Sequence, residues 1–271
     1  MIMPPALHIL CFGDSLTAGF SFWEPKDHPY SISLEATLKE AFPTINVTTD
    51  MQGLSGDQVI TPPGGFLTRM DILYQETHPQ NPYTHAIILG GTNDLFQHAS
   101  STSIYRALKD VWAIPLSNST DVLALTIPEC PTCEPALIPK RLKINSAILA
   151  QGEILAEERL LEEEWGLHAT DAKAKKGKFY TFDLCNEIPY ESLGEEEKKE
   201  LWGDGLHYSS KGYDLMGRLL AERIIELVEE EMGVKNEGDG MGRAGKEDED
   251  DSGEMMRTEL KKRGSEDIRE K

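Results

Sequence analysis

A serine, a histidine and an aspartate occupy positions suited to nucleophilic catalysis. Ser15 follows Gly13-Asp14 directly after a short apolar run, and Asp204 and His207 lie three residues apart in a glycine-flanked segment near the other end of the chain. A serine hydroxyl needs a base to become a nucleophile, and that base needs a carboxylate to fix its tautomer and stabilise its cation. These residue types indicate a candidate nucleophile, base and orienting acid. Helix capping by Asp14 or Ser15 is the structural alternative.

Glycines and an asparagine follow two further strand-like runs. Gly53 stands in the string Gln-Gly-Leu-Ser-Gly, and Asn93 stands in the string Gly-Gly-Thr-Asn-Asp. Near a glycine, a backbone N–H can approach a ligand closely, and an asparagine amide donates a hydrogen bond without carrying charge. Both are donor types that stabilise a developing oxyanion. The alternatives are an ordinary turn at Gly53 and helix capping by Asn93 or Asp94.

The elements that must position these residues can be predicted from periodicity. Short apolar or β-branched runs predict strands at His8–Phe12, Ile45–Thr49, Ala86–Leu89, Asp121–Ile127 and Phe179–Leu184. Helical spacing predicts helices at Ser31–Phe42, Ser103–Ile114 and Lys140–Trp165, and a last helix that is capped by Ser209 or Ser210 and ends at Gly233. Strands that alternate with helices predict an α/β domain whose parallel sheet is covered on both faces. In such sheets the chemistry gathers at the carboxyl ends of the strands, where the candidate residues stand.

Four short blocks, in this order, resemble the SGNH hydrolases, also called GDSL esterases/lipases. The blocks are Gly13-Asp14-Ser15-Leu16, Gly53, Gly91-Thr92-Asn93-Asp94 and Asp204-Gly205-Leu206-His207. The resemblance spans nearly the whole predicted domain and implies a three-layer α/β/α sandwich around a five-stranded parallel sheet, of the flavodoxin-like kind. One departure is Met51, which stands where the family often has an asparagine, two residues before the second-block glycine. It puts a supporting hydrogen bond in doubt.

The resemblance also implies a role for each motif residue. Ser15 would be the nucleophile, His207 the general base and then the general acid, and Asp204 the residue that orients His207. The backbone N–H groups of Ser15 and Gly53, with the Asn93 side chain, would form the oxyanion hole. No Gly-x-Ser-x-Gly elbow surrounds Ser15, which disfavours the α/β-hydrolase fold. In that fold the acid would follow another strand, which makes Asp183 the alternative to Asp204.

The expected function is the hydrolysis of carboxylic (acyl or acetyl) esters through an acyl-serine intermediate. A small-molecule ester is the expected partner, and no metal or cofactor is expected. An acyltransferase that uses the same triad and a catalytically silent binding or scaffold protein of the same fold are the alternatives. Phe20, Phe22 and Trp23 follow the Ser15 motif. They either line an acyl pocket or pack down on the domain.

Charge narrows the range of partners. The 271 residues carry 27 basic and 47 acidic side chains, a net charge of −20, which argues against a general binder of nucleic acid or anionic membranes. Residues 235–271 hold 9 basic and 12 acidic side chains with almost no large apolar ones. This predicts an acidic, disordered tail after a hydrolase domain at residues 1–234. No signal peptide or membrane-spanning run is found, so no stable membrane insertion and a cytoplasmic location are expected. The oligomeric state stays open.

Four cysteines are too few for a scaffold built on disulfides. Cys130 and Cys133 form a Cys-x-x-Cys pair in a proline-rich segment. A zinc site would need a second pair, and a redox motif would open a helix after a strand. A structural or incidental role is therefore predicted for this pair.

Overall fold

The sheet contains five parallel strands, as the strand-like runs predict. In the computed structural model, which describes residues 6–164 and 176–233, they are β1 (Ala6–Gly13), β2 (Asn46–Gly53), β3 (His85–Leu89), β4 (Asp121–Leu125) and β5 (Phe179–Phe182). Their order across the sheet is β2-β1-β3-β4-β5, which is the order of flavodoxin-like folds. The predicted α/β class with a five-stranded parallel sheet is confirmed.

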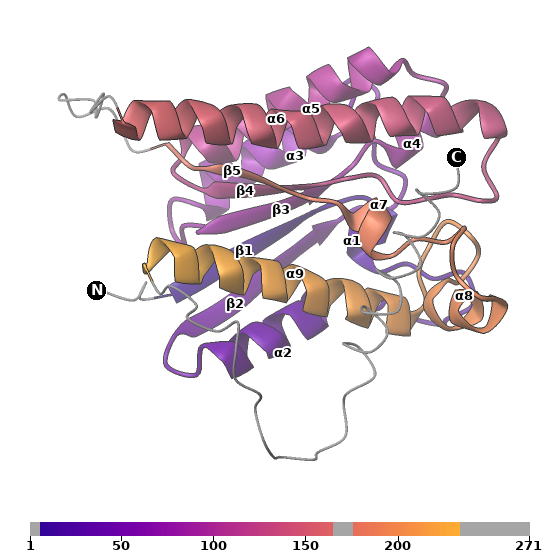
Figure 1. Cartoon of the computed structure of the whole chain (residues 1–271), viewed down its shortest axis with the longest axis horizontal. Helices are drawn as coiled ribbons and strands as arrows, with labels where there is room; N and C mark the ends of the chain where they lie inside the picture. Colours follow the sequence, from indigo (N-terminus) through magenta and orange to yellow (C-terminus); the bar gives the residue numbers. More distant parts are fainter. Residues whose placement is uncertain (1–5, 165–175, 234–271) are drawn as a thin grey trace.

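Helices cover both faces of the sheet and complete a three-layer α/β/α arrangement (Figure 1). One face carries α2 (Ser31–Ala41) and α9 (Ser210–Glu231), and the other carries α3 (Phe66–Ile72), α5 (Ser101–Ser117) and α6 (Ile138–Glu164). All four predicted helices are present with small shifts at their ends, although the predicted end of the third at Trp165 lies outside the described residues. None of the described helices has the length and apolarity needed to cross a membrane.

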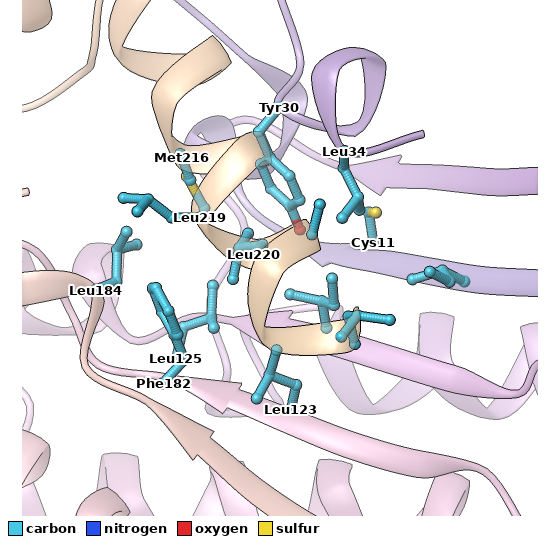
Figure 2. Packing of buried hydrophobic residues seen from close by; sticks show 14 of the residues in the cluster. Cys11, Tyr30, Leu34, Leu123, Leu125, Phe182, Leu184, Met216, Leu219 and Leu220 are labelled. Carbon is cyan, nitrogen blue, oxygen red and sulfur yellow. The ribbon is translucent and has the colours of Figure 1, made fainter. Parts of the chain in front are cut away.

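The side chains of β1 divide the core into two clusters. Leu7, Ile9 and Cys11 belong to the cluster under α2 and α9, whereas Leu10 and Phe12 belong to the cluster under α3, α5 and α6. Successive side chains of a strand point to opposite faces, so a strand that is apolar throughout buries both of them. Figure 2 shows the first cluster, in which side chains of α2 and α9 pack on those of the central strands.

α9 closes one face of the sheet directly after the segment that contains His207. Ser209 is its N-cap, because the Ser209 side chain accepts a hydrogen bond from Gly212 N at 3.2 Å. Within the helix, Gly217 allows a close approach to α2, since a Cβ there would lie 2.3 Å from the Tyr30 carbonyl oxygen. The last helix therefore packs closely against the first half of the fold.

Short helices that the sequence did not predict gather mainly at the carboxyl ends of the strands. They are α1 (Ser15–Ala18), α4 (Thr92–Phe96), α7 (Leu184–Glu187) and α8 (Glu195–Leu201), together with α3, a π-helical turn (Leu73–Thr77) after it and a 3-10 turn (Pro135–Leu137) before α6. Each is too short to show a helical period in the sequence. The strand order reverses between β1 and β3, and α1 and α4 directly follow these two strands. Ligands of such sheets bind at this reversal point.

Candidate active site

Ser15 is the first residue of α1, at the carboxyl end of β1. Asp14 precedes the helix, and its side chain accepts a hydrogen bond from Leu16 N at 3.0 Å. Gly13 permits the sharp turn between strand and helix, since a Cβ there would lie 2.6 Å from the Leu89 carbonyl oxygen. Asp14 is therefore the residue that caps the helix, and the hydroxyl of Ser15 is left for other contacts.

His207 connects Ser15 with Asp204. His207 Nε2 lies 3.0 Å from Ser15 Oγ, and His207 Nδ1 lies 2.9 Å from Asp204 Oδ2. Asp204 Oδ1 also accepts hydrogen bonds from the backbone N–H of Leu206 at 2.9 Å and of His207 at 2.7 Å. The Phe20 ring packs edge-on against the imidazole, with ring centroids 4.9 Å apart. Ser15, His207 and Asp204 are therefore connected by hydrogen bonds in sequence. The Asp204 carboxylate is also held in place by backbone N–H groups of its own loop.

The environment of Asp204 keeps its carboxylate ionised. Burial raises its pKa, but hydrogen bonds from the His207 ring and from two backbone N–H groups outweigh burial, so the pKa lies below its usual value. Asp183, the alternative acid, accepts a hydrogen bond from Thr126 Oγ1 at 2.8 Å. Of the two aspartates considered from the sequence, Asp204 is the one that contacts the His207 ring.

Gly53 ends β2 beside the turn that carries Ser15. The strands pair in parallel with Gly13 opposite Gly53, and a Cβ on Gly53 would lie 2.2 Å from Ala18 N. Glycine therefore lets β2 pack directly against α1. The Gly53 N–H donates to Met51 Sδ at 3.3 Å. The residue that departs from the family pattern thus places a weak sulfur acceptor on a candidate oxyanion donor.

Asn93 lies at the start of α4 and points its amide toward the other two strand ends. Asn93 Nδ2 donates to the carbonyl oxygen of Asp57 at 2.9 Å and lies 3.3 Å from Asp14 Oδ2. The next residue, Asp94, is buried and accepts hydrogen bonds from Val59 N and Ile60 N, both at 3.0 Å. The contacts of Asp94 fix α4 to the segment after β2, and those of Asn93 hold its amide between Asp14 and Asp57.

Asp14 is the carboxylate closest in sequence to the candidate nucleophile, and it is fully buried. Burial raises the pKa of its carboxyl to about 7. The Leu16 N–H opposes this shift, and the charges of Asp94 and Asp57 add to it. A carboxyl group that titrates near neutral pH therefore lies beside both Ser15 and the Asn93 amide.

An ion pair that the sequence did not predict lies beneath Gly53. Arg69 of α3 donates through Nη1 to Asp57 Oδ2 at 2.6 Å. The same side chain donates to the carbonyl oxygens of Gly13 and Gln52, the former at 3.3 Å. The sequence signal was a single arginine in a largely apolar stretch, for which no element was predicted.

A small apolar pocket adjoins α4, the helix that carries Asn93. It is lined by Leu95 and Phe96 of α4, by Ile127 after β4, and by the disulfide between Cys130 and Cys133. Thr132, inside the disulfide loop, donates to the Gly205 carbonyl oxygen at 3.5 Å. The cysteine pair therefore forms part of a pocket wall, and its loop touches the segment between Asp204 and His207.

The aromatic residues after Ser15 divide into two groups. Phe20 packs on His207, as described above. Phe22 and Trp23 are 64% and 73% exposed and pack on each other with ring centroids 4.8 Å apart. Phe22 and Trp23 therefore do not pack down on the domain, which was one of the two expected roles. Among the described residues, no group of histidine, cysteine, aspartate and glutamate side chains is arranged to hold a metal ion.

Comparisons with known proteins identify the family. The model of the GDSL-like lipase/acylhydrolase family matches residues 11–215. The chain therefore belongs to this family, the SGNH hydrolases, as the four blocks indicated. No curated protein matches the sequence.

Solved structures share the fold at low sequence identity. A lipolytic protein of the G-D-S-L family from Veillonella parvula is 17% identical with a TM-score of 0.53, over 85% of this chain and 100% of that chain. The esterase EstA from a Pseudoalteromonas species, in a structure inhibited by monoethylphosphonate, is 16% identical with a TM-score of 0.53, over 82% and 98%. A lipase/acylhydrolase from Enterococcus faecalis is 20% identical with a TM-score of 0.51, over 82% and 96%. At this level of identity the likeness concerns the fold.

Proposed function

We propose that the protein is a serine esterase that hydrolyses carboxylic esters through an acyl-serine intermediate. The observation that carries the proposal is the line of hydrogen bonds from Ser15 Oγ through His207 to Asp204, with contacts of 3.0 and 2.9 Å. A nucleophile, a base and an orienting acid at these distances are the arrangement required for nucleophilic catalysis. Membership of the GDSL-like lipase/acylhydrolase family supports the same reaction class.

In the acylation step, Ser15 Oγ attacks the carbonyl carbon of the ester while His207 Nε2 takes the hydroxyl proton. Asp204 accepts the hydrogen bond from Nδ1 and stabilises the imidazolium that forms. The ionised state of Asp204 suits this role, because its pKa is lowered by the hydrogen bonds it accepts. The imidazolium then gives its proton to the leaving alcohol as the carbon–oxygen bond breaks, and Ser15 is left acylated.

Negative charge develops on the carbonyl oxygen, where three donors are available. The N–H groups of Ser15 and Gly53 and the Asn93 amide come from the ends of β1, β2 and β3. To bind the oxyanion, the Asn93 amide gives up its long contact with Asp14 Oδ2, and the Gly53 N–H gives up its weak contact with Met51 Sδ. The oxyanion is the stronger acceptor in both cases. In deacylation, His207 removes a proton from water as the water oxygen attacks the acyl carbon. The bond between that carbon and Ser15 Oγ then breaks, His207 returns the proton to Oγ, and the acid is released.

The pocket beside α4 supports a small apolar group on one side of the ester. Its wall is mostly apolar, with Leu95, Phe96, Ile127 and the disulfide, and Arg141 is the charged residue in its lining. The net charge of −20 also opposes anionic substrates and surfaces. We therefore place short acyl or acetyl esters first among the substrates to be tested.

A fluorophosphonate probe tests the nucleophile directly, because it labels a serine that a histidine has activated. The wild-type protein is expected to be labelled, and Ser15→Ala is expected to lose the label. Ser117→Ala, at the exposed end of α5, is the matched serine control and is expected to label like the wild type. Labelling that persists in Ser15→Ala would refute the assignment of the nucleophile.

A panel of esters graded in acyl length and leaving group then tests the reaction. Hydrolysis of any member that Ser15→Ala abolishes supports the esterase. If labelled protein hydrolyses no ester but transfers an acyl group to an added alcohol, the acyltransferase alternative is correct. If the wild type neither labels nor hydrolyses, the chain is the silent scaffold of the third hypothesis.

A further inference from the structure

Arg69 lies under the ends of two strands that carry candidate oxyanion donors. It belongs to α3, and its guanidinium donates to the carbonyl oxygens of Gln52 at the end of β2 and Gly13 at the end of β1. The third contact of the same group is the ion pair with Asp57 at 2.6 Å. A single guanidinium therefore joins the two strand ends and one acidic side chain.

The contact with Gln52 acts on the peptide group that contains the Gly53 N–H. The Gln52 carbonyl and the Gly53 N–H are two ends of one planar unit, and in a trans peptide they point in opposite directions. A cation that holds the carbonyl oxygen on one side therefore fixes the direction of the N–H on the other side. It also draws electron density toward the oxygen, which strengthens the N–H as a donor.

The surroundings of Arg69 make this contact strong and well defined. Its side chain is 20% exposed and that of Asp57 is 5% exposed, so water screens the charges little. The guanidinium carbon lies 4.5 Å from the centroid of the Phe12 ring, which supports the cation from its apolar side. The planar fork reaches three acceptors at once, which the single nitrogen of a lysine cannot do.

We infer that Arg69 is a positioning residue for the oxyanion hole. It orients and polarises the Gln52–Gly53 peptide so that the Gly53 N–H meets the oxyanion of the transition state. The inference rests on the proposed function and adds to it a residue outside the four sequence blocks. Arg69 touches neither the substrate nor the reacting atoms, so its loss should slow the chemical step without weakening substrate binding.

Two variants and one control separate this role from a purely structural one. Arg69→Met keeps an apolar stem over Phe12 but donates no hydrogen bond, and Arg69→Lys keeps the charge on a single nitrogen. Because Arg69→Met leaves the buried Asp57 carboxylate without its partner, the double variant Arg69→Met with Asp57→Asn provides a second form that can fold. Arg223→Met removes an arginine paired at 2.9 Å with Glu226 within α9 and controls for the loss of an ion pair.

The measurements are kcat and KM for an ester that the wild type hydrolyses, the inhibition constant of a trifluoromethyl ketone, and thermal unfolding. The ketone is informative because Ser15 adds to it and leaves an oxyanion in the hole. We expect Arg69→Met, alone and with Asp57→Asn, to lower kcat about 10- to 100-fold, since one oxyanion donor is weakened and not removed. The ketone should bind more weakly by a similar factor, while KM changes little. Arg69→Lys should fall between Arg69→Met and the wild type, and Arg223→Met should match the wild type.

The inference is overturned if a folded Arg69→Met variant keeps wild-type kcat, or if KM rises while kcat and ketone binding hold. It is also overturned if kcat falls but ketone binding does not, since the oxyanion hole would then be intact. An active wild type with an Arg69→Met variant of equal kcat and equal ketone binding contradicts this inference alone. A wild type that neither hydrolyses esters nor binds the ketone contradicts the proposed function and this inference with it.

Discussion

Asp14 and Asp204 lie next to the two partners of the proposed proton transfer, yet their surroundings shift their pKa values in opposite directions. Asp14 precedes Ser15 at the end of a buried strand, and burial raises its pKa to about 7. Asp204 precedes His207 in a surface loop. There burial raises the pKa of Asp204, but hydrogen bonds from the His207 ring and from two backbone N–H groups lower it by more than burial raises it. An aspartate is thus kept ionised in the loop of Asp204, whereas at the strand end the carboxyl of Asp14 titrates near neutral pH.

The difference between the two pKa shifts follows from the groups that each region positions. The loop from Asp204 to His207 needs a fixed negative charge, and it obtains this charge through hydrogen bonds to the carboxylate. The strand-end region needs tightly packed donors, and it obtains them by burial among β1, β2 and β3. In the buried region desolvation of the carboxylate dominates, whereas in the loop the hydrogen bonds to Asp204 outweigh it. The following predictions test whether these two regions differ in this way.

The largest expected effect is on the loop side. Asp204→Asn keeps the shape of the side chain but removes the charge that stabilises the imidazolium and fixes its tautomer. Turnover should fall by about 10⁴-fold, as for the corresponding change in other serine triads, with little change in folding. Steady-state kinetics and thermal unfolding test this. Asp183→Asn is the matched control, and if it proved as damaging as Asp204→Asn, the acid would have been wrongly assigned.

The next effect concerns stability and pH on the strand-end side. A carboxyl whose pKa is raised in the folded state favours folding while it is protonated in that state, so its contribution is complete below its unfolded pKa near 4. That contribution is lost as the pH rises to about 7, the folded value. Asp14→Asn removes this titration. Relative to the wild type, the variant should therefore gain up to about 4 kcal/mol of unfolding free energy between pH 4 and pH 8.

Urea unfolding of both proteins at several pH values measures this gain. Asp204→Asn provides the contrast, because the pKa of Asp204 is lowered in the folded state. The stability contributed by Asp204 is present above its unfolded pKa and disappears as the pH falls through the folded value. The proposed difference between the regions would be refuted if the unfolding free energies of Asp14→Asn and Asp204→Asn, each relative to the wild type, changed with pH in the same direction.

A smaller effect is expected from Asn93, which joins the two strand ends through its amide. Asn93→Ala removes one oxyanion donor and should slow turnover by about 10²- to 10³-fold, equivalent to about 3 kcal/mol. KM for a small ester should stay close to the wild-type value. The measurement is kcat at saturating ester, and full activity in a folded Asn93→Ala protein would exclude the amide from the oxyanion hole.

The smallest effect is expected from the disulfide loop. Thr132 touches the segment between Asp204 and His207 at 3.5 Å, while the catalytic loop is fixed by its own hydrogen bonds. Replacing Cys130 and Cys133 together by serine should therefore change kcat by less than about threefold, within the range of ordinary surface changes. KM for esters with an apolar acyl group should rise, because the pair lines the pocket. A collapse of kcat would show that the loop supports the triad.

The parts of the site that could be predicted from sequence are those that directly follow periodic segments. Ser15 and Asn93 come after strongly apolar strands, so their place at one edge of the sheet followed from the α/β pattern. β2 was harder, because it is an edge strand with a half-exposed, polar sequence, and its predicted end at Thr49 fell short of the observed end at Gly53. The pairing of Gly13 with Gly53 extends the strand beyond its apolar part.

Arg69 and Asp57 could not be predicted in the same way. Their ion pair forms because the irregular segment between β2 and α3 turns back under the strand ends, and such a path leaves no period in the sequence. The contact between Met51 and Gly53 depends equally on local geometry. The predicted division between a domain at residues 1–234 and a disordered tail stays a prediction, since residues 234–271 lie outside the described part of the chain.

Ser15 and His207 are separated by 192 residues, and the base is followed at once by α9. The ribosome therefore makes the proposed nucleophile 192 residues before the proposed base. α9 also covers the apolar face that it shares with α2. A chain released before residue 207 would lack both the proposed base and the helix that covers its core. Termination before residue 207 would therefore leave the proposed triad incomplete and part of the core exposed to proteases, so the ester hydrolysis proposed above would report only chains that extend through α9.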